Sequence, residues 1–374
     1  MARRETPAAG PGSRALVVDV IRSATTISRV ELAGLTGLTQ PSISNIVRDL
    51  IADDVIHETG SAGSVRGKPR KLLAITPANR FGIGFQLGGE SLTCVAADLT
   101  GGVVGREVVP LGRADLAQRF EDFTTGLDLP AGRIEGLAIV GPDHEADRLE
   151  RDDLAARLGV PVLVENDAAA AALGEFWTRR VSREQSFGSV YLSTGIGAGL
   201  VFGGSLFRGA SFDAGELGHL SIAYDGRPCP CGNQGCVERY ASMAAVVEAA
   251  RADSLVPPGG TTFAAYDAIA RAAVGGDAAA FALLDQAAGH LSVAVTSMVN
   301  LLDLGRLVLT GPGVAVAGSI YARRLREHLA RTAHARHRHD IVVELSAQPR
   351  DAAAIGAAAL VVQASIAPGH SSFQ

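Results

Sequence analysis

The chain has 374 residues, 47% of them hydrophobic and 20% charged, with a formal net charge of -5 at pH 7. This composition is typical of a globular protein and excludes a disordered one, and the length allows two or three domains with cores of their own. We expect no apolar run long enough to cross a membrane.

The N-terminal part of the chain is more basic than the rest. Residues 1–76 hold ten Lys and Arg against seven Asp and Glu, whereas the remainder holds 24 against 32. A basic head on an acidic body favours binding of nucleic acid by the head. The first stretch, 1–13, is rich in Ala, Pro and Gly and lacks the apolar core of a secretory signal, so it predicts a mobile arm on a cytoplasmic protein.

Residues 14–76 predict a winged helix-turn-helix. Apolar residues at helical spacing over 15–23 predict its first helix. Ser28, with Glu31 three residues later, forms a capping box for a second helix. Thr39 then caps a third helix, which carries its proline in the first turn, where a proline costs no hydrogen bond.

Two strands at 55–60 and 71–77 follow, joined by a glycine-rich tip that carries cations, as in a wing. Polar side chains on the outer face of the third helix suit the major groove, and the cations of the tip suit phosphates. The candidate DNA contacts are Gln40, Ser42, Ser44, Asn45, Arg48, Arg66, Lys68 and Arg70. The alternative is a helical protein-docking module with a solvated polar face.

Residues 77–374 predict an α/β body. Apolar runs alternate with glycine turns over 80–111, as in hairpin strands, and the same pattern returns at 186–209. Further buried strands are predicted at 134–141, 160–167 and 306–313, and helices at 114–127, 167–180, 262–275, 277–302, 318–333 and 351–366.

Three of the four cysteines fall within eight residues and indicate a metal site. Cys229, Cys231 and Cys236 follow His219, which lies ten residues before the first of them. One histidine and three thiolates form a closed tetrahedral set, typical of structural Zn²⁺. A Cys231–Cys236 disulfide or buried free thiols are the alternatives, and a reducing cytosol disfavours the disulfide.

Two carboxylates flank this predicted metal site. Glu216 lies three residues before His219, and Glu238 lies two residues after Cys236. A metal that binds one ring nitrogen of His219 leaves the other free to donate a hydrogen bond. We therefore expect a rigid polar cluster suited to the hydroxyl groups of a sugar.

The sequence E-x-G-H followed by C-x-C-G-x-x-G-C-x-E resembles the signature of the ROK family (repressors, open reading frames, sugar kinases). The resemblance covers residues 14–366 and implies that His219 and the three cysteines hold zinc, while Glu216, His219 and Glu238 contact a sugar. It also implies that Asn166 and Asp167 are the sugar-binding Asn and the kinase base of the family. The winged helix resembles that of ROK repressors of the xylose and N-acetylglucosamine type.

The resemblance further implies a two-lobed ribonuclease-H-like fold of the actin and hexokinase type over 77–374. Lobe one would be about 77–182 with the C-terminal helix 351–366, and lobe two about 183–350.

The motifs that would hold ATP are incomplete. Where kinases of the family carry Asp-x-Gly-Gly-Thr, this chain has Gln86 in place of the acid and Glu90 in place of the hydroxyl. A carboxylate about 4 Å from a phosphate oxygen costs several kcal/mol. The segment 193–199 resembles the second phosphate turn and is equally well a tight hairpin. We expect no kinase activity, with Asp167 acting as a hydrogen-bond acceptor.

The predicted function is a sugar-controlled transcriptional regulator of the repressor type that binds a palindromic DNA operator as a homodimer or tetramer. Two alternatives stay open. One is a sugar kinase with an added DNA-binding head. The other is a DNA-binding regulator without a small-molecule ligand, because the segment 141–152 is shorter than the family's sugar-covering loop and retains only Gly141-Pro142.

Overall fold

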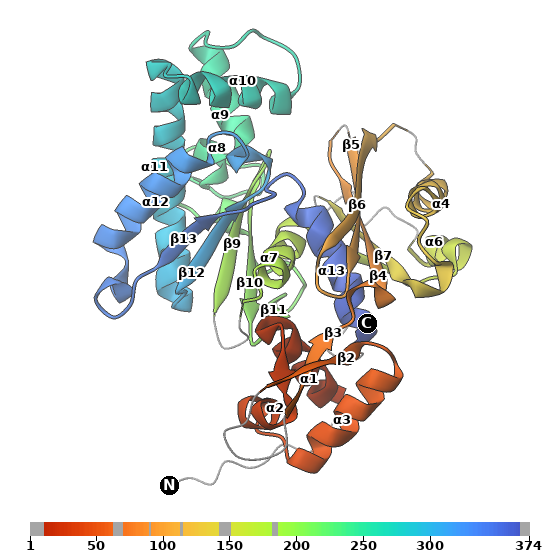
Figure 1. Ribbon diagram of the computed structural model, residues 1–374. Coiled ribbons are helices and arrows are strands. Elements are labelled where there is room, and N and C mark those ends of the chain that lie inside the picture. The colour runs from red at the N-terminus through yellow and green to blue at the C-terminus, as the bar shows by residue number, and fades with distance from the viewer. Residues whose placement is uncertain are drawn as a thin grey trace. The chain divides into compact units, whose positions relative to one another are not determined.

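The structure is a computed structural model that describes residues 11–62, 70–89, 91–112, 115–141, 151–181 and 186–366. Its contacts divide the chain into two compact units. Unit one comprises Met1–Asp167, Phe176–Glu184 and Ala354–Gln374, and unit two comprises Ala168–Glu175 and Gln185–Ala353. Figure 1 labels the helices and strands of both.

The N-terminal part of unit one has the elements of a winged helix-turn-helix. Its helices and strands are α1 (Pro11–Ala24), β1 (Ile27–Ser28), α2 (Arg29–Thr36), α3 (Gln40–Ala52), β2 (Ile56–Ala62) and β3 (Arg70–Ile75), and the strands pair in the order β1-β3-β2. Ser28 and Glu31 form the predicted capping box, and Gly37 ends α2 with a φ of 70°. The Thr39 side chain accepts from the backbone N–H of Ser42 and so caps α3.

The remainder of unit one is built on a mixed five-stranded sheet with the order β6-β5-β4-β7-β8. Its strands are β4 (Phe81–Leu87), β5 (Ser91–Asp98), β6 (Val103–Pro110), β7 (Ile134–Gly141) and β8 (Val162–Asn166), and β4, β7 and β8 are mutually parallel. Short 3-10 turns, η1 (Pro77–Asn79) and η2 (Ala131–Arg133), lie before β4 and β7.

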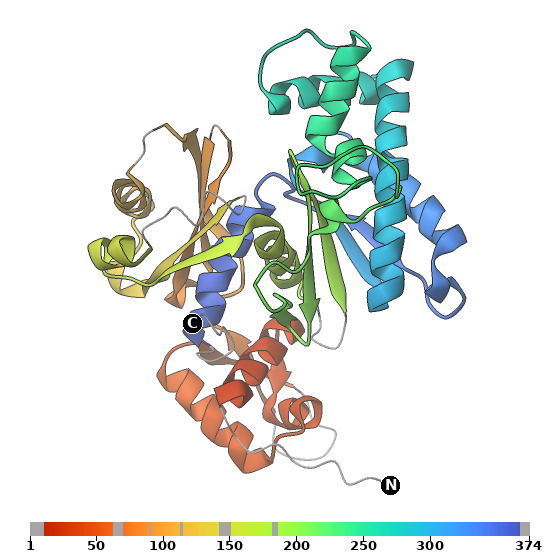
Figure 2. The same cartoon turned by 180° about the vertical axis from the view of Figure 1, so that it is seen from behind.

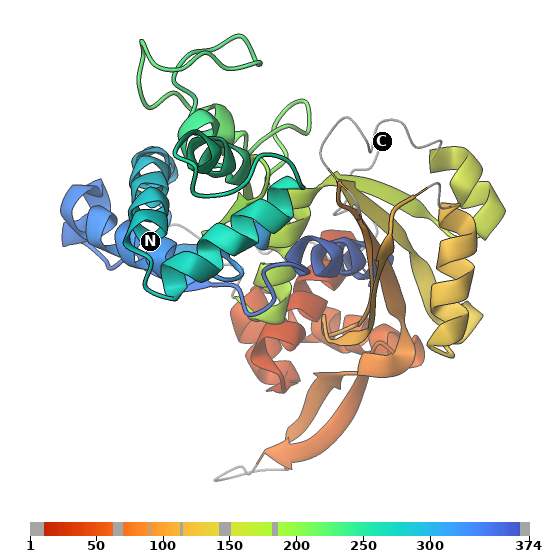
Figure 3. The same ribbon diagram turned by 90° about the horizontal axis from the view of Figure 1, so that it is seen from above.

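Helices cover both faces of this sheet. Figure 3 shows α4 (Leu116–Gly126) and α6 (Arg151–Leu158) on one face and α13 (Ala352–Ile366) on the other. The contact of α13 with β4 is unusually close, because a Cβ added at Gly84 would lie 2.1 Å from the backbone oxygen of Ala354. Glycine in β4 thus allows the C-terminal helix to pack directly on the sheet.

Unit two is built on a second five-stranded sheet with the order β11-β10-β9-β12-β13. Its strands are β9 (Phe187–Leu192), β10 (Ile196–Phe202), β11 (Ser205–Leu206), β12 (Arg306–Thr310) and β13 (Val342–Leu345). Its other elements are η3 (Leu217–His219), α8 (Glu238–Ala241), α9 (Met243–Ala252), α10 (Thr262–Val274), α11 (Ala278–Leu302), η4 (Pro312–Val314), α12 (Gly318–Thr332) and η5 (His334–His337). Figure 2 shows α11 and α12 against one face of this sheet and α7 (Asp167–Thr178) against the other.

One helix departs from the expectation about membrane-spanning segments. By length and composition alone, α11 is long and apolar enough to cross a membrane. Its inward face, however, is packed into the core of unit two, with Leu284, Leu291, Val295 and Val299 at most 1% exposed. An alanine-rich core helix and a membrane span have similar hydropathy, which is why the sequence alone does not separate them.

Candidate functional site

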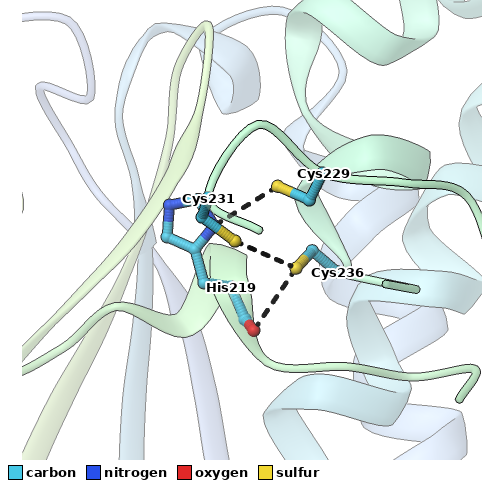
Figure 4. A group of neighbouring side chains, drawn as sticks. All are labelled: His219, Cys229, Cys231 and Cys236. Atoms are coloured by element: carbon cyan, nitrogen blue, oxygen red, sulfur yellow. Dashed lines mark hydrogen bonds between the residues drawn. The ribbon is translucent and has the colours of Figure 1, made fainter. Parts of the chain in front are cut away.

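The predicted metal ligands come together in unit two. The ligand atoms of His219, Cys229, Cys231 and Cys236 all lie within 4.8 Å of one another (Figure 4). The Sγ atoms of Cys231 and Cys236 are 3.7 Å apart, and Nδ1 of His219 is 3.6 Å from Sγ of Cys229. Tetrahedral zinc with ordinary bond lengths requires separations of about 3.8 Å and about 3.6 Å. The side chains therefore form a cluster able to hold a metal ion of that size.

Backbone turns of the loop between η3 and α8 bring the ligands together. The backbone N–H of Cys229 donates to the carbonyl of Asn233, and that of Gly232 donates to the carbonyl of Cys229. Gly235 has a φ of 70°, and a Cβ on it would lie 1.7 Å from the carbonyl oxygen of Ala223. Only glycine fits at this position, directly before the last cysteine.

The surroundings shift the pKa values of two of the thiols in opposite directions. Burial raises the pKa of Cys236 to about 12, whereas a backbone hydrogen bond from Asn233 lowers the pKa of the exposed Cys231. A buried thiol becomes a metal-ligating thiolate only when a positive charge replaces its proton. A divalent ion at the centre of the four ligand atoms would supply that charge.

His219 connects the metal ligands to a carboxylate. While Nδ1 faces Cys229, Nε2 lies 3.8 Å from Oε2 of Glu216, which immediately precedes η3. The two ring nitrogens thus have different partners, as expected when a metal holds one of them and the other orients toward a carboxylate.

Glu238 begins α8, two residues after the last of the clustered cysteines. Its Oε2 accepts a hydrogen bond of 3.1 Å from the backbone N–H of Ile196. A Cβ added at Gly195 would lie 2.6 Å from this oxygen, and one at Gly218, the neighbour of His219, would lie 3.0 Å from it. Glycines at both positions make room for the Glu238 carboxylate beside the metal cluster.

The other two predicted sugar ligands belong to unit one. Asn166 ends β8, and Asp167 begins α7. Glu216, His219 and Glu238 belong to unit two. Convergence of all five side chains on one sugar stays a prediction.

Within the described residues, the predicted phosphate-binding segments contribute to strand pairing and to helix packing. Gln86 lies within β4, opposite Thr93 of β5, and Glu90 lies outside the described residues. Added Cβ atoms at Gly197 and Gly199 would lie 2.6 Å and 2.3 Å from the Cβ atoms of Ala168 and Ala172 on α7. These two glycines allow α7 to pack on β10, which favours the hairpin interpretation of 193–199.

The candidate DNA-binding residues are only partly available at the surface. Gln40, Ser44, Asn45 and Arg48 are exposed on α3, and Arg70 is exposed at the start of β3. Ser42 is half-buried, and its Oγ lies 2.9 Å from the hydroxyl of the capping residue Thr39. Arg66 and Lys68 lie outside the described residues.

A support of the metal loop was not predicted from the sequence. The Tyr240 hydroxyl accepts from the backbone N–H of Arg227 at 2.7 Å, and the Arg227 guanidinium lies 4.9 Å from the Tyr240 ring centroid. The same ring lies beside that of His290 on α11, with centroids 5.1 Å apart. No spacing signal joins residues so distant in the chain, so sequence patterns do not reveal this stack.

Comparison with known proteins places these features in one family. The ROK family model matches residues 147–364. The putative xylose repressor of Caldicellulosiruptor sp. (strain Rt8B.4) is 25% identical over 383 residues, which cover 94% of this chain and 95% of the repressor. A glucokinase of Halalkalibacterium halodurans is 26% identical over 318 residues, which cover 76% of this chain and 96% of the kinase. The repressor thus matches nearly the full chain, whereas the kinase matches only about three quarters of it.

A solved structure extends the likeness to the fold. The crystal structure of a ROK family transcriptional regulator, a homologue of the E. coli MLC protein, superposes with a TM-score of 0.74 over 96% of this chain and 97% of that chain, at 24% identity. The predicted α/β fold class is confirmed.

Proposed function

Since the chain belongs to the ROK family, we propose that it is a sequence-specific DNA-binding transcriptional regulator of the repressor type, controlled by a sugar. The observation that carries this proposal is the joining of a winged helix-turn-helix to a ROK body in one chain. The likeness to a named xylose repressor over 94% of the chain supports it.

The head, residues 14–76, binds the operator. The exposed side chains of α3 enter the major groove, and Arg70 with Arg66 and Lys68 of the wing contact phosphates. One helix-turn-helix reads a half-site, so a palindromic operator requires two copies of the chain. The acting form is therefore a homodimer, or a tetramer built from dimers, in the cytoplasm where the DNA lies.

The body, residues 77–374, binds a structural zinc ion and a sugar. His219, Cys229, Cys231 and Cys236 hold the zinc, which fixes the ring of His219. Glu216, His219 and Glu238 bind sugar hydroxyls together with Asn166 and Asp167. Sugar binding that favours one of two states of the body then shifts the affinity for the operator.

The body is not a working kinase in this proposal. Gln86 and Glu90 replace the two side chains that would organise Mg²⁺ and phosphate, and Asp167 accepts a hydrogen bond without acting as a base. The likeness to a glucokinase makes phosphorylation the second candidate function. ATP consumption with D-glucose, D-xylose or N-acetylglucosamine, lost on Asp167→Asn, would favour that candidate.

A gel-shift assay tests the proposed function. The probe is the duplex upstream of the chain's own gene, with an unrelated duplex of equal length as competitor, in the presence and absence of D-xylose or N-acetylglucosamine. We expect retention of the specific probe and a change of its Kd with one sugar. Equal binding to both duplexes would contradict a sequence-specific regulator, and specific binding that ignores every sugar of a broad panel would indicate the regulator without a small-molecule ligand.

A further inference from the structure

Arg22, in the last turn of α1, is the only buried Lys or Arg in the part of the chain that the structure describes, at 3% exposed. Its Nη1 donates to the backbone oxygen of Trp177 at 2.9 Å, and its Nη2 donates to Oδ1 of Asp19 at 2.7 Å. The guanidinium carbon lies 4.9 Å from the Trp177 ring centroid and 5.3 Å from that of Phe176. All four residues belong to unit one.

These contacts join the DNA-binding head to the C-terminal turn of α7. The carbonyl of Trp177 belongs to the last turn of that helix, where it accepts from the backbone N–H of Arg180 at 3.0 Å and where the helix dipole favours a cation. Arg22 supplies a second donor to this carbonyl, together with the charge. A buried cation must be paired and hydrogen-bonded, so its place is closely specified.

A second contact lies beside the first. Arg180, just after α7, donates to the hydroxyl of Thr25, just after α1. Both residues have left-handed backbones, with φ of 52° and 67°. For the β-branched Thr25 this conformation is strained and persists only where the surroundings hold it. A hydrogen bond therefore joins the residues that follow α1 to those that follow α7.

The opposite end of α7 carries Asp167, and Asn166 immediately precedes it. A helix of this length, 12 residues, spans about 18 Å as a stiff rod. The middle of α7, Ala168–Glu175, is counted with unit two, and both of its ends are counted with unit one. One helix thus connects two candidate sugar ligands to the head.

We propose that Arg22 is the positioning residue that couples sugar binding to DNA binding, by holding the head on the C-terminal turn of α7. This inference rests on the proposed function. Displacement of Asp167 by a bound sugar moves α7, and the buried Arg22 transmits that movement to α1 and the attached helix-turn-helix. Arg22 touches neither ligand, so its removal uncouples the two binding events without abolishing either.

The test compares Arg22→Met with Arg22→Lys and with the control Arg14→Met in the full zinc-loaded chain. Methionine keeps the apolar stem of the buried side chain, and lysine keeps its charge but loses the planar stacking and the two-nitrogen fork that donates to Trp177 and Asp19. Arg14 lies on the same helix, and its exposed ion pair with Asp53 stays inside the head. The readouts are the Kd for the duplex upstream of the chain's own gene, with and without saturating D-xylose or N-acetylglucosamine, and the sugar Kd from calorimetry.

We expect wild type and Arg14→Met to show a sugar-dependent change in DNA Kd within the usual range of roughly 5- to 150-fold, and Arg22→Met to fall to about twofold or less. Arg22→Lys should lie between them. Both ligands should still bind to Arg22→Met with Kd values near those of wild type. A wild-type coupling factor in Arg22→Met would overturn the role of Arg22 and leave the proposed function intact, whereas a wild-type chain that binds neither DNA nor sugar would overturn both.

A fluorescence measurement tests the link between DNA binding and the Arg22–Trp177 contact even if a variant fails to fold or neither sugar binds. Trp177 is the single tryptophan of the chain, and its indole Nε1 is buried with no hydrogen-bond partner among the described residues. Stacking on Arg22 is thus its main polar contact. We expect the emission of wild type to change when the specific duplex is added, and this change to shrink in Arg22→Lys. Unchanged wild-type emission with DNA bound would overturn the coupling.

Discussion

His219 lies with Nε2 3.8 Å from Oε2 of Glu216, while its Nδ1 lies 3.6 Å from Sγ of Cys229 in the metal cluster. The two ring nitrogens therefore connect the metal cluster to a carboxylate that the family resemblance assigns to a sugar. Because the metal would fix the ring through one nitrogen, it would also fix the direction in which the other nitrogen donates. Stability and sugar recognition should then depend on the same ion.

Removal of one thiolate should release the metal. We expect Cys236→Ser to lose bound zinc and to unfold at a markedly lower temperature, because Cys236 is fully buried and structural zinc contributes directly to folding. Zinc per chain and Tm are the measurements. Cys94→Ala is the control, since Cys94 is a buried thiol of β5 outside the cluster. Full zinc content in Cys236→Ser would contradict the four-ligand site.

Loss of a sugar-binding carboxylate should weaken sugar binding and leave DNA binding unchanged. For Glu216→Gln we expect the free energy of sugar binding to weaken by roughly 1.5–3 kcal/mol, the usual worth of a hydrogen bond to a charged group. Calorimetry with D-xylose and N-acetylglucosamine measures it, and the Kd for the operator duplex without sugar should stay at the wild-type value. Glu248→Gln, on α9, is a matched control. An unchanged sugar Kd in Glu216→Gln would remove Glu216 from the site.

The outer face of α3 should decide DNA affinity. Arg48 is exposed there, with its guanidinium held by Asp49 and Asn45 of the same helix. If Arg48 contacts a base, Arg48→Ala should weaken operator binding by about 1–3 kcal/mol. If Arg48 contacts a phosphate, the substitution should reduce the slope of log Kd against log salt concentration by about one. Titrations at several salt concentrations separate the two roles. Arg14→Ala, on α1 and paired with Asp53 at the C-terminal end of α3, should change neither.

Acid should weaken the support of the metal loop through His290. Burial, and then the charge of Arg227, lower the pKa of His290 below 6.5. The neutral imidazole therefore contributes stability above pH 6.5, and this contribution is lost as the pH falls through the lower pKa of the folded state. From about pH 7 to about pH 5, Tm should fall more steeply in wild type than in His290→Gln. The exposed His334→Gln should follow wild type; equal slopes in wild type and His290→Gln would exclude His290 as the cause.

The packing of α13 on β4 should not accept a methyl group. A Cβ at Gly84 would lie 2.1 Å from a backbone oxygen of α13, which cannot rotate away as a side chain would. Gly84→Ala should therefore lower the free energy of unfolding by about 1–3 kcal/mol or more, as measured by urea denaturation. At Gly132 an added Cβ meets nothing within 4 Å, so Gly132→Ala should leave stability near the wild-type value.

Local patterns predicted the elements whose signals lie close together in the chain. The Ser28 capping box, the Thr39 cap and the continuous apolar runs of β4, β7 and β9 depend on neighbouring residues only. The metal cluster was predictable for the same reason, because three of its ligands lie within one short loop.

Elements with weak local signals were not assigned. The short β13 contains Val342 and three further residues, and α6 is polar on most of its surface, with Leu154 alone buried. The contacts of Arg22 with Trp177 and of Tyr240 with His290 join residues far apart in the chain, which no spacing rule encodes. The expectation that no apolar run is long enough to cross a membrane was wrong for α11, because a long alanine-rich core helix passes the same test of length and hydropathy as a span.

The most direct test of the central proposal measures the Kd of the purified chain for the duplex upstream of its own gene, as D-xylose and N-acetylglucosamine are titrated in, with ATP turnover followed in the same samples. We predict tight binding that depends on the DNA sequence, a shift in that Kd with one of the sugars, and no turnover. Turnover stimulated by a sugar, together with equal affinity for any duplex, would contradict it.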